Sequence, residues 1–389
     1  MEFEWDPELD VFRAEVREFS RRHATPELRE EMRRGSGEGE GAGPRTKALH
    51  DELDQRGWLR IAWPTAYGGG GKSPWYQFVM VQEFSYWSIP YGGLSVGSIA
   101  PALMNSGTEE QKTKYLPGIL DGNITFAIGY SEPNAGTDLA SLQTRAVRDG
   151  DEWVINGQKI WTSQAQVATH LWLAARTDPE APKHRGISMF ILPLNTTGIS
   201  IRPLYTMAGM RTNEVFFKEA RIPADSLIGE ENRGWYTVAN ALDFERVSLA
   251  PHGALARQWE RIIEHMKAHS PTRLTDPAVR TRLADLKIEL HMLRALNTVN
   301  ADIIASGRTP TMEASMIKVL SSELRYRLSA AGMDLLGRAG GLRQESGDLA
   351  PCDGQNEQTY RSSPILRFGG GTNEVQRSII AQRGLGLPR

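Results

Sequence analysis

The stretch AVRDGDEWVINGQKIWTS, residues 146–163, marks where the chain changes from helical to β-rich patterning. Two short apolar runs, Ala146-Val147 and Trp153-Val154-Ile155, flank Asp149-Gly150, and Asp-Gly in that setting predicts a tight hairpin. For the same reason a second turn is expected at Asn156-Gly157. Further β-rich runs occur at 170–175, 187–194, 199–204 and 214–217. Residues 126–221 therefore predict a small antiparallel barrel or sandwich of about 100 residues.

Both flanks of this β-rich region have helical patterns. Before it, Phe12, Val16 and Phe19 recur at helical spacing within residues 6–34, and Thr108 resembles a helix N-cap. After it, helices are expected at 235–269, 277–306, 312–336 and 373–382. We therefore predict an α+β protein with an N-terminal helical domain (1–124), a middle antiparallel β-barrel (125–222) and a C-terminal four-helix bundle (223–389).

Composition narrows the classes of function. The 389 residues include 45 basic and 47 acidic side chains, a net charge of −2, so no global basic field attracts nucleic acid or an anionic membrane. Cys352 is the only cysteine, which excludes an internal disulfide, and no Cys/His cluster suggests a metal site. Residues 1–20 are too charged for a signal peptide, and no run of about 18 apolar residues predicts a membrane span. A cytoplasmic location is expected.

Two segments of the β-rich region carry polar groups suited to a cofactor. YSEPNAGTD (130–138) places the hydroxyls of Ser131 and Thr137 around a Pro/Gly turn, where they can bind a phosphate or the polar edge of a flat ring. The alternative is a structural Asx or Ser/Thr turn. KIWTS (159–163) places Trp161 before two hydroxyls; an exposed indole could cover an aromatic cofactor, whereas a buried one would belong to the sheet core. The pattern alone leaves both questions open.

A third candidate is a carboxylate within an apolar helical row. At 3.6 residues per turn, Val238, Leu242, Glu245 and Leu249 share one stripe. A buried carboxylate is costly unless it is paired or functional, and burial raises its pKa above the reference value of about 4.3, which suits a general base. The alternative is that Glu245 reaches the rim and pairs with a cation, and periodicity does not decide between the two.

With these segments in this order, the chain resembles the acyl-CoA dehydrogenase family over nearly its whole length. YSEPNAGTD and INGQKIWTS look like two signature segments of that family's barrel. GMRTNEVFFKEARIPADSLIGEENRGW (209–235) looks like the end of the barrel, and GGTNEVQRSIIAQRGLGLPR (370–389) is similar to the last helix. Each match is weak alone, but four in register on a helix–barrel–helix layout are strong.

The resemblance implies an FAD enzyme acting on an acyl-CoA thioester. It places FAD between the barrel, the C-terminal helices and a neighbouring subunit. The residues implied at the cofactor are Tyr130, Ser131, Gly136, Thr137, Trp161, Thr162, Ser163, Thr372 and Glu374. Thr137, Asp243 and Arg246 are implied at the acyl-CoA.

The implied reaction is α,β-desaturation, as in β-oxidation. Many family members carry the base in a C-terminal Glu-Gly-Thr, which is absent here because the matching run is Gly370-Gly371-Thr372. Asp243-Phe244-Glu245-Arg246 instead matches the pattern of isovaleryl-CoA and long-chain dehydrogenases, which carry the base on the helix after the barrel. The resemblance thus implies that Glu245 removes the α-proton, that flavin N5 takes the β-hydride, and that the Gly370 N–H binds the thioester carbonyl.

The same resemblance implies an electron-transfer flavoprotein as electron acceptor and a homotetramer as the leading assembly. Residues 272–277 and 334–338 depart from the family's adenine-side patterns, so a heterotetramer of two different subunits is the alternative. An acyl-CoA oxidase using O₂ and a non-catalytic or half-site subunit are the competing functions. The motifs do not choose between branched, long and steroid-derived acyl groups.

Overall fold

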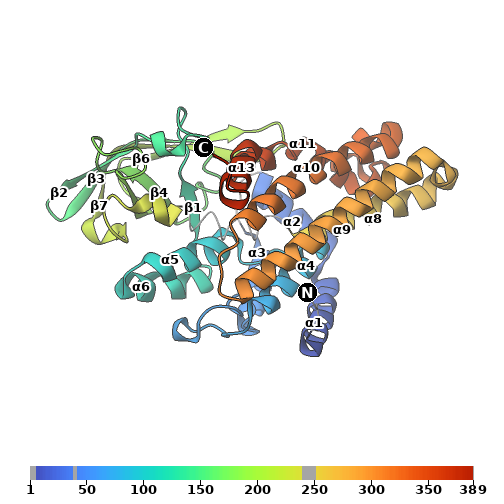
Figure 1. The fold of residues 1–389 in the computed structure, drawn as a ribbon, viewed down its shortest axis with the longest axis horizontal. Helices are drawn as coiled ribbons and strands as arrows, with labels where there is room; N and C mark the ends of the chain where they lie inside the picture. The colour runs from blue at the N-terminus through green and yellow to red at the C-terminus, as the bar shows by residue number, and fades with distance from the viewer. Residues whose placement is uncertain (1–5, 38–41, 239–250, 389) are drawn as a thin grey trace. The chain divides into compact units, whose positions relative to one another are not determined.

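A computed structural model describes residues 6–37, 42–238 and 251–388 (Figure 1). The chain divides into two compact units. The first unit, residues 1–24, 72–90 and 246–389, is helical, and the second, residues 25–71 and 91–245, combines helices with a β-sheet. The structure thus confirms the predicted α+β class with helical segments on either side of a β-region. The division into three domains with the stated boundaries stays a prediction.

Long amphipathic helices build the helical unit. In Figure 1, α9 (Pro277–Ala305) runs beside α8 (His252–His269) and α10 (Met312–Leu335), and α4 (Pro74–Trp87) packs against α1 (Pro7–His23) and α8. Leucines and isoleucines from α8, α9 and α10 form one apolar core. The predicted helices at 277–306 and 312–336 are confirmed. Further helices of this unit are α11 (Gln355–Ser362), α12 (Ile365–Phe368) and α13 (Asn373–Ile379). Within the described ranges, no helix has the length and apolar character needed to cross a membrane.

The second unit begins with helices that have clear end signals. Its helices include α2 (Pro26–Gly37), α3 (Pro44–Gln55), α5 (Ala100–Ser106) and α6 (Glu109–Leu120). Thr108 caps α6 as expected: its hydroxyl accepts from the Gln111 N–H at 3.2 Å, and the Gln111 side chain accepts from the Thr108 N–H at 3.0 Å. Residues 6–34 are helical as expected, but they form two helices, because α1 ends at His23 and Pro26 starts α2. Proline lacks an N–H and suits a first turn, not a helix interior.

In the described part of the chain, eight strands form one sheet in the order β6-β7-β3-β2-β4-β5-β8, with β1 paired to β4. The strands are β1 (Phe126–Gly129), β2 (Arg145–Asp149), β3 (Glu152–Lys159), β4 (His170–Arg176), β5 (Ile187–Pro193), β6 (Ile199–Tyr205), β7 (Arg211–Pro223) and β8 (Leu227–Ile228). The hairpin predicted at Asp149-Gly150 joins β2 to β3. The sheet is mainly antiparallel, as predicted. It also contains two parallel pairings, β1–β4 and β2–β4, which join distant segments and which local patterns therefore did not reveal.

The second turn predicted at Asn156-Gly157 is wrong. Strand β3 runs straight through these residues, and its register with β7 shifts between Ile155 and Gly157, which is a β-bulge. Gly157 has φ +146°, and a Cβ there would lie 2.7 Å from the Thr144 Cα. Pairing with β7 continues on both sides of Asn156-Gly157, so these residues do not form a turn. The glycine instead permits the register shift and the close approach of the Thr144 backbone.

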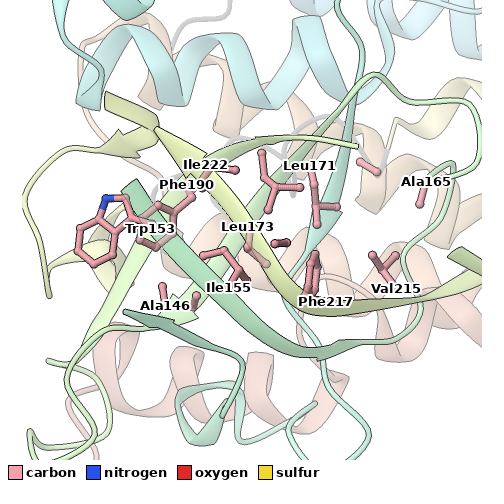
Figure 2. Packing of buried hydrophobic residues seen from close by; sticks show 14 residues of the cluster. Ala146, Trp153, Ile155, Ala165, Leu171, Leu173, Phe190, Val215, Phe217 and Ile222 are labelled. Carbon is pink, nitrogen blue, oxygen red and sulfur yellow. The ribbon is translucent and has the colours of Figure 1, made fainter. Parts of the chain in front are cut away.

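The core of the sheet is a cluster of buried apolar side chains (Figure 2). They occupy alternate positions along their strands and therefore lie on the same face of the sheet. Trp153 of β3 packs edge-on against Phe190 of β5, with ring centroids 5.2 Å apart, and both rings are buried. Ile155, two residues further along β3, belongs to the same cluster. Ala127 of β1 also belongs to this core, and the candidate site segments extend from the ends of β1 and β3.

Candidate functional site

Two of the predicted cofactor segments leave the sheet side by side. Tyr130 directly follows β1, and Trp161 lies just beyond the end of β3. The Ile160 N–H donates to the Ser131 carbonyl at 2.9 Å, and the Lys159 ammonium donates to the Tyr130 carbonyl at 3.0 Å. The structure therefore brings Tyr130 and Ser131 beside the segment that holds Trp161, Thr162 and Ser163, residues about 30 positions away in the sequence.

A buried ion pair holds this junction together. The Lys159 ammonium lies 2.7 Å from the Glu132 carboxylate, and both side chains are buried. Glu132 also accepts from the backbone N–H groups of Gln143 at 2.6 Å and Thr144 at 2.8 Å. Burial acts to raise the pKa of Glu132, but Lys159 and these hydrogen bonds outweigh it and hold that pKa below its usual value. Burial lowers the pKa of Lys159 to about 8 against the attraction of Glu132, so both groups are charged at pH 7.

Trp161 projects from this junction into solvent. Its backbone is left-handed, with φ +62°, and 57% of the residue is exposed. A non-glycine residue in this conformation is strained and is held there by its surroundings. The exposure excludes the alternative that Trp161 belongs to the sheet core, and it leaves the indole accessible to a ligand.

Thr162, the next residue, is fully buried and its backbone is tied to β7. Its N–H donates to the Asn213 carbonyl at 3.0 Å, and its carbonyl accepts from the Asn213 side-chain amide at 2.9 Å. Its hydroxyl, by contrast, is buried without a hydrogen-bond partner among the described residues. An unsatisfied buried hydroxyl is unusual in a native protein and indicates a site where a ligand supplies the missing partner.

The remaining members of the predicted barrel-side set lie at the edges of this junction. Glu132 and Ala135 exchange two backbone hydrogen bonds of 3.0 Å, which closes the turn after β1. Gly136 and Thr137 follow that turn and are exposed. The Ser163 hydroxyl lies 3.4 Å from the Thr212 hydroxyl on β7. The Tyr130 side chain is buried.

The C-terminal candidates lie in the helical unit. Gly370 and Gly371 both have left-handed backbones, with φ +68° and +87°, directly before α13. Thr372 caps this helix by accepting from the Val375 N–H at 3.2 Å, and Glu374 is exposed in its first turn. The helix's own first-turn N–H lowers the pKa of Glu374, and the Thr372 hydroxyl contributes to that shift. The Gln376 amide donates to the Gly370 carbonyl at 3.0 Å, and its Oε1 is buried without a hydrogen-bond partner in the described structure.

The predicted acid–base and substrate residues Asp243, Glu245 and Arg246 lie in 239–250, outside the described residues. Of the apolar stripe that contains Glu245, Val238 is described, and it is buried. The structure therefore describes the barrel-side and C-terminal sets of residues, each within its own unit.

Sequence reasoning missed several residues that shape these segments. Glu132 and Lys159 both lie within the quoted motifs. Each is an ionisable residue next to the end of an apolar strand, and this placement could have indicated a buried ion pair. Asn213, which holds Thr162, carried no such signal. In the other unit, Lys318 of α10 donates to the buried Asn373 side chain at 2.8 Å and so fixes the start of α13. In residues 6–37, 42–238 and 251–388, no group of three metal-ligating side chains occurs.

Comparison with protein families places the chain among known proteins. Three family models match it in order: the acyl-CoA dehydrogenase N-terminal domain over residues 6–123, the middle domain over 127–220 and the C-terminal domain over 232–385. Together they cover most of the chain.

Individual relatives match over the full length. The chain is 41% identical to the acyl-CoA dehydrogenase FadE26 of Mycobacterium tuberculosis, over all of this chain and 99% of that one. Among solved structures it is similar to the Tcur3481-Tcur3483 steroid ACAD, with a TM-score of 0.92, 40% identity and full coverage of both chains. It is also similar to the ChsE4-ChsE5 complex from Mycobacterium tuberculosis, with a TM-score of 0.89, 39% identity and full coverage of both. The chain therefore belongs to the acyl-CoA dehydrogenase family of oxidoreductases.

Proposed function

We propose that this enzyme introduces a double bond between Cα and Cβ of an acyl-CoA thioester and that it uses FAD to do so. The observation that carries the proposal is the exposed Trp161 beside the buried, unpartnered hydroxyl of Thr162. A flat ring with a polar edge fits this pair, because the indole offers a stacking face and the hydroxyl offers one hydrogen bond. Family members are FAD flavoproteins, and an isoalloxazine has both features.

The residues proposed to hold the cofactor come from two parts of the sequence. On the barrel side these are Tyr130, Ser131, Gly136, Thr137, Trp161, Thr162 and Ser163. On the C-terminal side they are Thr372 and Glu374. Bound FAD supplies a hydride acceptor that no amino-acid side chain can provide. The Glu132–Lys159 pair keeps the two barrel-side segments together and so positions the groups that contact the ring.

We assign the acid–base role to Glu245. Its place in an apolar helical stripe favours a raised pKa, and Gly370-Gly371-Thr372 lacks the alternative carboxylate. Removal of a proton next to a thioester builds negative charge on the carbonyl oxygen, and the backbone N–H of Gly370 is the proposed donor to it. Asp243, Arg246 and Thr137 are proposed to contact the acyl-CoA, and an electron-transfer flavoprotein is the proposed electron acceptor.

The decisive test is Glu245→Gln, which keeps the side-chain shape and removes the base. We expect flavin content to stay at the wild-type level and turnover with acyl-CoA and a dye acceptor to fall by about 10²–10⁴-fold. Glu231→Gln, an exposed carboxylate ahead of the same segment, is the matched control and should leave turnover unchanged. Wild-type turnover in Glu245→Gln would refute the assignment.

We further propose a steroid-derived acyl group as substrate and a second acyl-CoA dehydrogenase chain as partner. Two full-length structural relatives at 39–40% identity carry paired protein names, and one of them is called a steroid ACAD. Flavin bleaching with branched, long-chain and steroid-derived acyl-CoAs should favour the last group. The mass of the native assembly, with and without the co-expressed partner, distinguishes the hetero-assembly from a homotetramer. Rapid reoxidation of the reduced flavin by O₂ would instead indicate an oxidase.

A further inference from the structure

The helical unit contains a cavity that the proposed reaction does not use. It has a volume of about 500 Å³, which lies within the range of small-molecule sites, and α1, α4, α8 and α9 line it. Its lining combines aromatic and apolar side chains of α4 with basic side chains of α1 and α9. Its principal lining residues are Arg13, Phe78, Tyr86, Trp87, Lys287 and Arg294.

Basic residues face the cavity from two helices. Lys287, His291 and Arg294 stand at i, i+4 and i+7 on α9 and thus share one helix face. Arg13 and Arg17 stand one turn apart on α1. Like charges one turn apart on a helix repel one another, and the basic side chains of both helices line this one cavity.

The carboxylates of the lining do not neutralise this charge. Four basic side chains, Arg13, Arg17, Lys287 and Arg294, stand against two lining carboxylates, Glu83 and Glu260, and Arg13 also pairs with Asp10, outside the lining, at 3.2 Å. Glu83 is engaged by Arg17, with hydrogen bonds of 2.8 and 3.2 Å. Glu260 accepts from the Tyr86 hydroxyl.

The two lining cations that make no ion pair with a described residue, Lys287 and Arg294, both come from α9. Lys287 lies 4.5 Å from the centre of the Trp259 ring, a contact that leaves its charge uncompensated. Arg294 makes no ion pair with any described residue. A guanidinium that has no carboxylate partner and lies beside apolar side chains can bind an anionic group through charge-assisted hydrogen bonds.

His252 reports this excess of positive charge. Burial, together with repulsion from Arg294, Arg13, His291 and Lys287, lowers its pKa to about 4. The imidazole is therefore neutral at pH 7, and its Nδ1 is buried without a hydrogen-bond partner among the described residues. The cavity thus contains an unsatisfied polar atom as well as uncompensated cations.

We propose that this cavity binds an amphipathic organic anion, with its carboxylate at Lys287 and Arg294 and its apolar body against Phe78, Tyr86 and Trp87. The charge selects an anion, since neither Lys287 nor Arg294 has an ion-pair partner among the described residues. The aromatic wall selects an apolar body, because such surface gains stability when it leaves water. This proposal does not depend on the desaturation proposed above.

The test is calorimetric titration of the full chain, loaded with its flavin, with dodecanoate below its micelle concentration. Dodecyltrimethylammonium has the same apolar body with a cation, and inorganic phosphate has the charge without the body. We expect dodecanoate to bind and both others to bind at least about tenfold more weakly. Equal binding of the cationic surfactant, or of phosphate alone, would overturn the proposal.

Charge-removing variants identify the site and separate it from the acyl-CoA site. Arg294→Gln and Lys287→Gln should each weaken dodecanoate binding by about tenfold or more, because each removes a charge-assisted hydrogen bond. Arg280→Gln removes an exposed cation from the same helix outside the cavity and is the matched control. Unchanged thermal unfolding shows that a variant is folded. Dodecanoate affinity in Arg294→Gln and Lys287→Gln equal to that in Arg280→Gln would refute this site.

Discussion

Lys159→Met tests the buried ion pair that joins the two barrel-side segments. Methionine keeps most of the side-chain volume and removes the ammonium. The Glu132 carboxylate then stays buried, loses the Lys159 donor and keeps only its two backbone N–H donors. Removal of one partner of a buried pair costs about 3–5 kcal/mol, because the other charge loses its compensation. The Tyr130 carbonyl also loses the Lys159 donor, so the segments that would contact the flavin should separate more readily.

Hydrogen exchange followed by mass spectrometry measures this effect locally. If β3 opens as a unit, a loss of 3–5 kcal/mol accelerates exchange of its amides by about 10²- to 10³-fold or more, while peptides from α9 should exchange at the wild-type rate. The matched control is Lys183→Met, which breaks the Lys183–Asp138 pair of 2.6 Å. Both of its side chains are mostly exposed, so its loss should cost less than about 1 kcal/mol.

Glu132→Gln combined with Lys159→Met completes a double-mutant cycle. Since neither variant side chain leaves an uncompensated charge, the double variant should be more stable than the sum of the single losses by at least about 1 kcal/mol. If Lys159→Met changes β3 exchange no more than Lys183→Met does, the pair does not hold the junction and this reasoning is wrong.

Three further outcomes follow from the structure. Gly157→Ala should lower stability by about 2 kcal/mol or more in urea unfolding, because its Cβ would meet Thr144 at a left-handed φ, whereas Gly136→Ala, with no atom within 4 Å of its Cβ, should be nearly neutral. The unfolded state binds the His252 proton more tightly, so stability should fall between about pH 6.5 and 4, by up to about 3 kcal/mol. In His252→Gln that slope should flatten, as measured by urea midpoints across this range. Trp161→Ala should lower flavin affinity by about tenfold in fluorescence titration while leaving unfolding unchanged, since this side chain is mostly exposed.

Elements with strong local signals were predictable from the sequence. The Asp149-Gly150 hairpin, the Thr108 cap and the two long helices at 277–305 and 312–335 all depend on residues within a few positions of one another. Elements decided by distant partners were not. The parallel pairing of β1 with β4 joins residues more than 40 positions apart, and no period or turn signal reports it. The break after His23 has a local signal, Pro26, which the helical spacing of Phe12, Val16 and Phe19 alone does not report.

Asn156-Gly157 illustrates why one dipeptide has two outcomes. Both Asp149-Gly150 and Asn156-Gly157 stand between β-rich runs, and Gly150, with φ +62°, makes the turn. At Gly157 the strand continues, because β7 pairs with β3 on both sides of the glycine and Thr144 approaches its backbone too closely for a Cβ. Whether Asn-Gly forms a turn here therefore depends on a neighbouring strand about 60 residues away, and a prediction from local sequence does not consider that strand.

The same distinction explains which parts of the candidate site were found. Trp161 and Thr162 stood out by residue type, but the reason that Trp161 is exposed lies in contacts with Asn213 and Ser131, which hold its neighbours Thr162 and Ile160. A motif thus names the residues that meet a ligand, while their orientation depends on partners elsewhere in the chain. It follows that a relative could keep YSEPNAGTD and IWTS unchanged and still lose flavin through a substitution at position 213. Asn213→Leu should therefore reduce flavin affinity about as strongly as Trp161→Ala, and full flavin affinity in that variant would show that the segment orients itself.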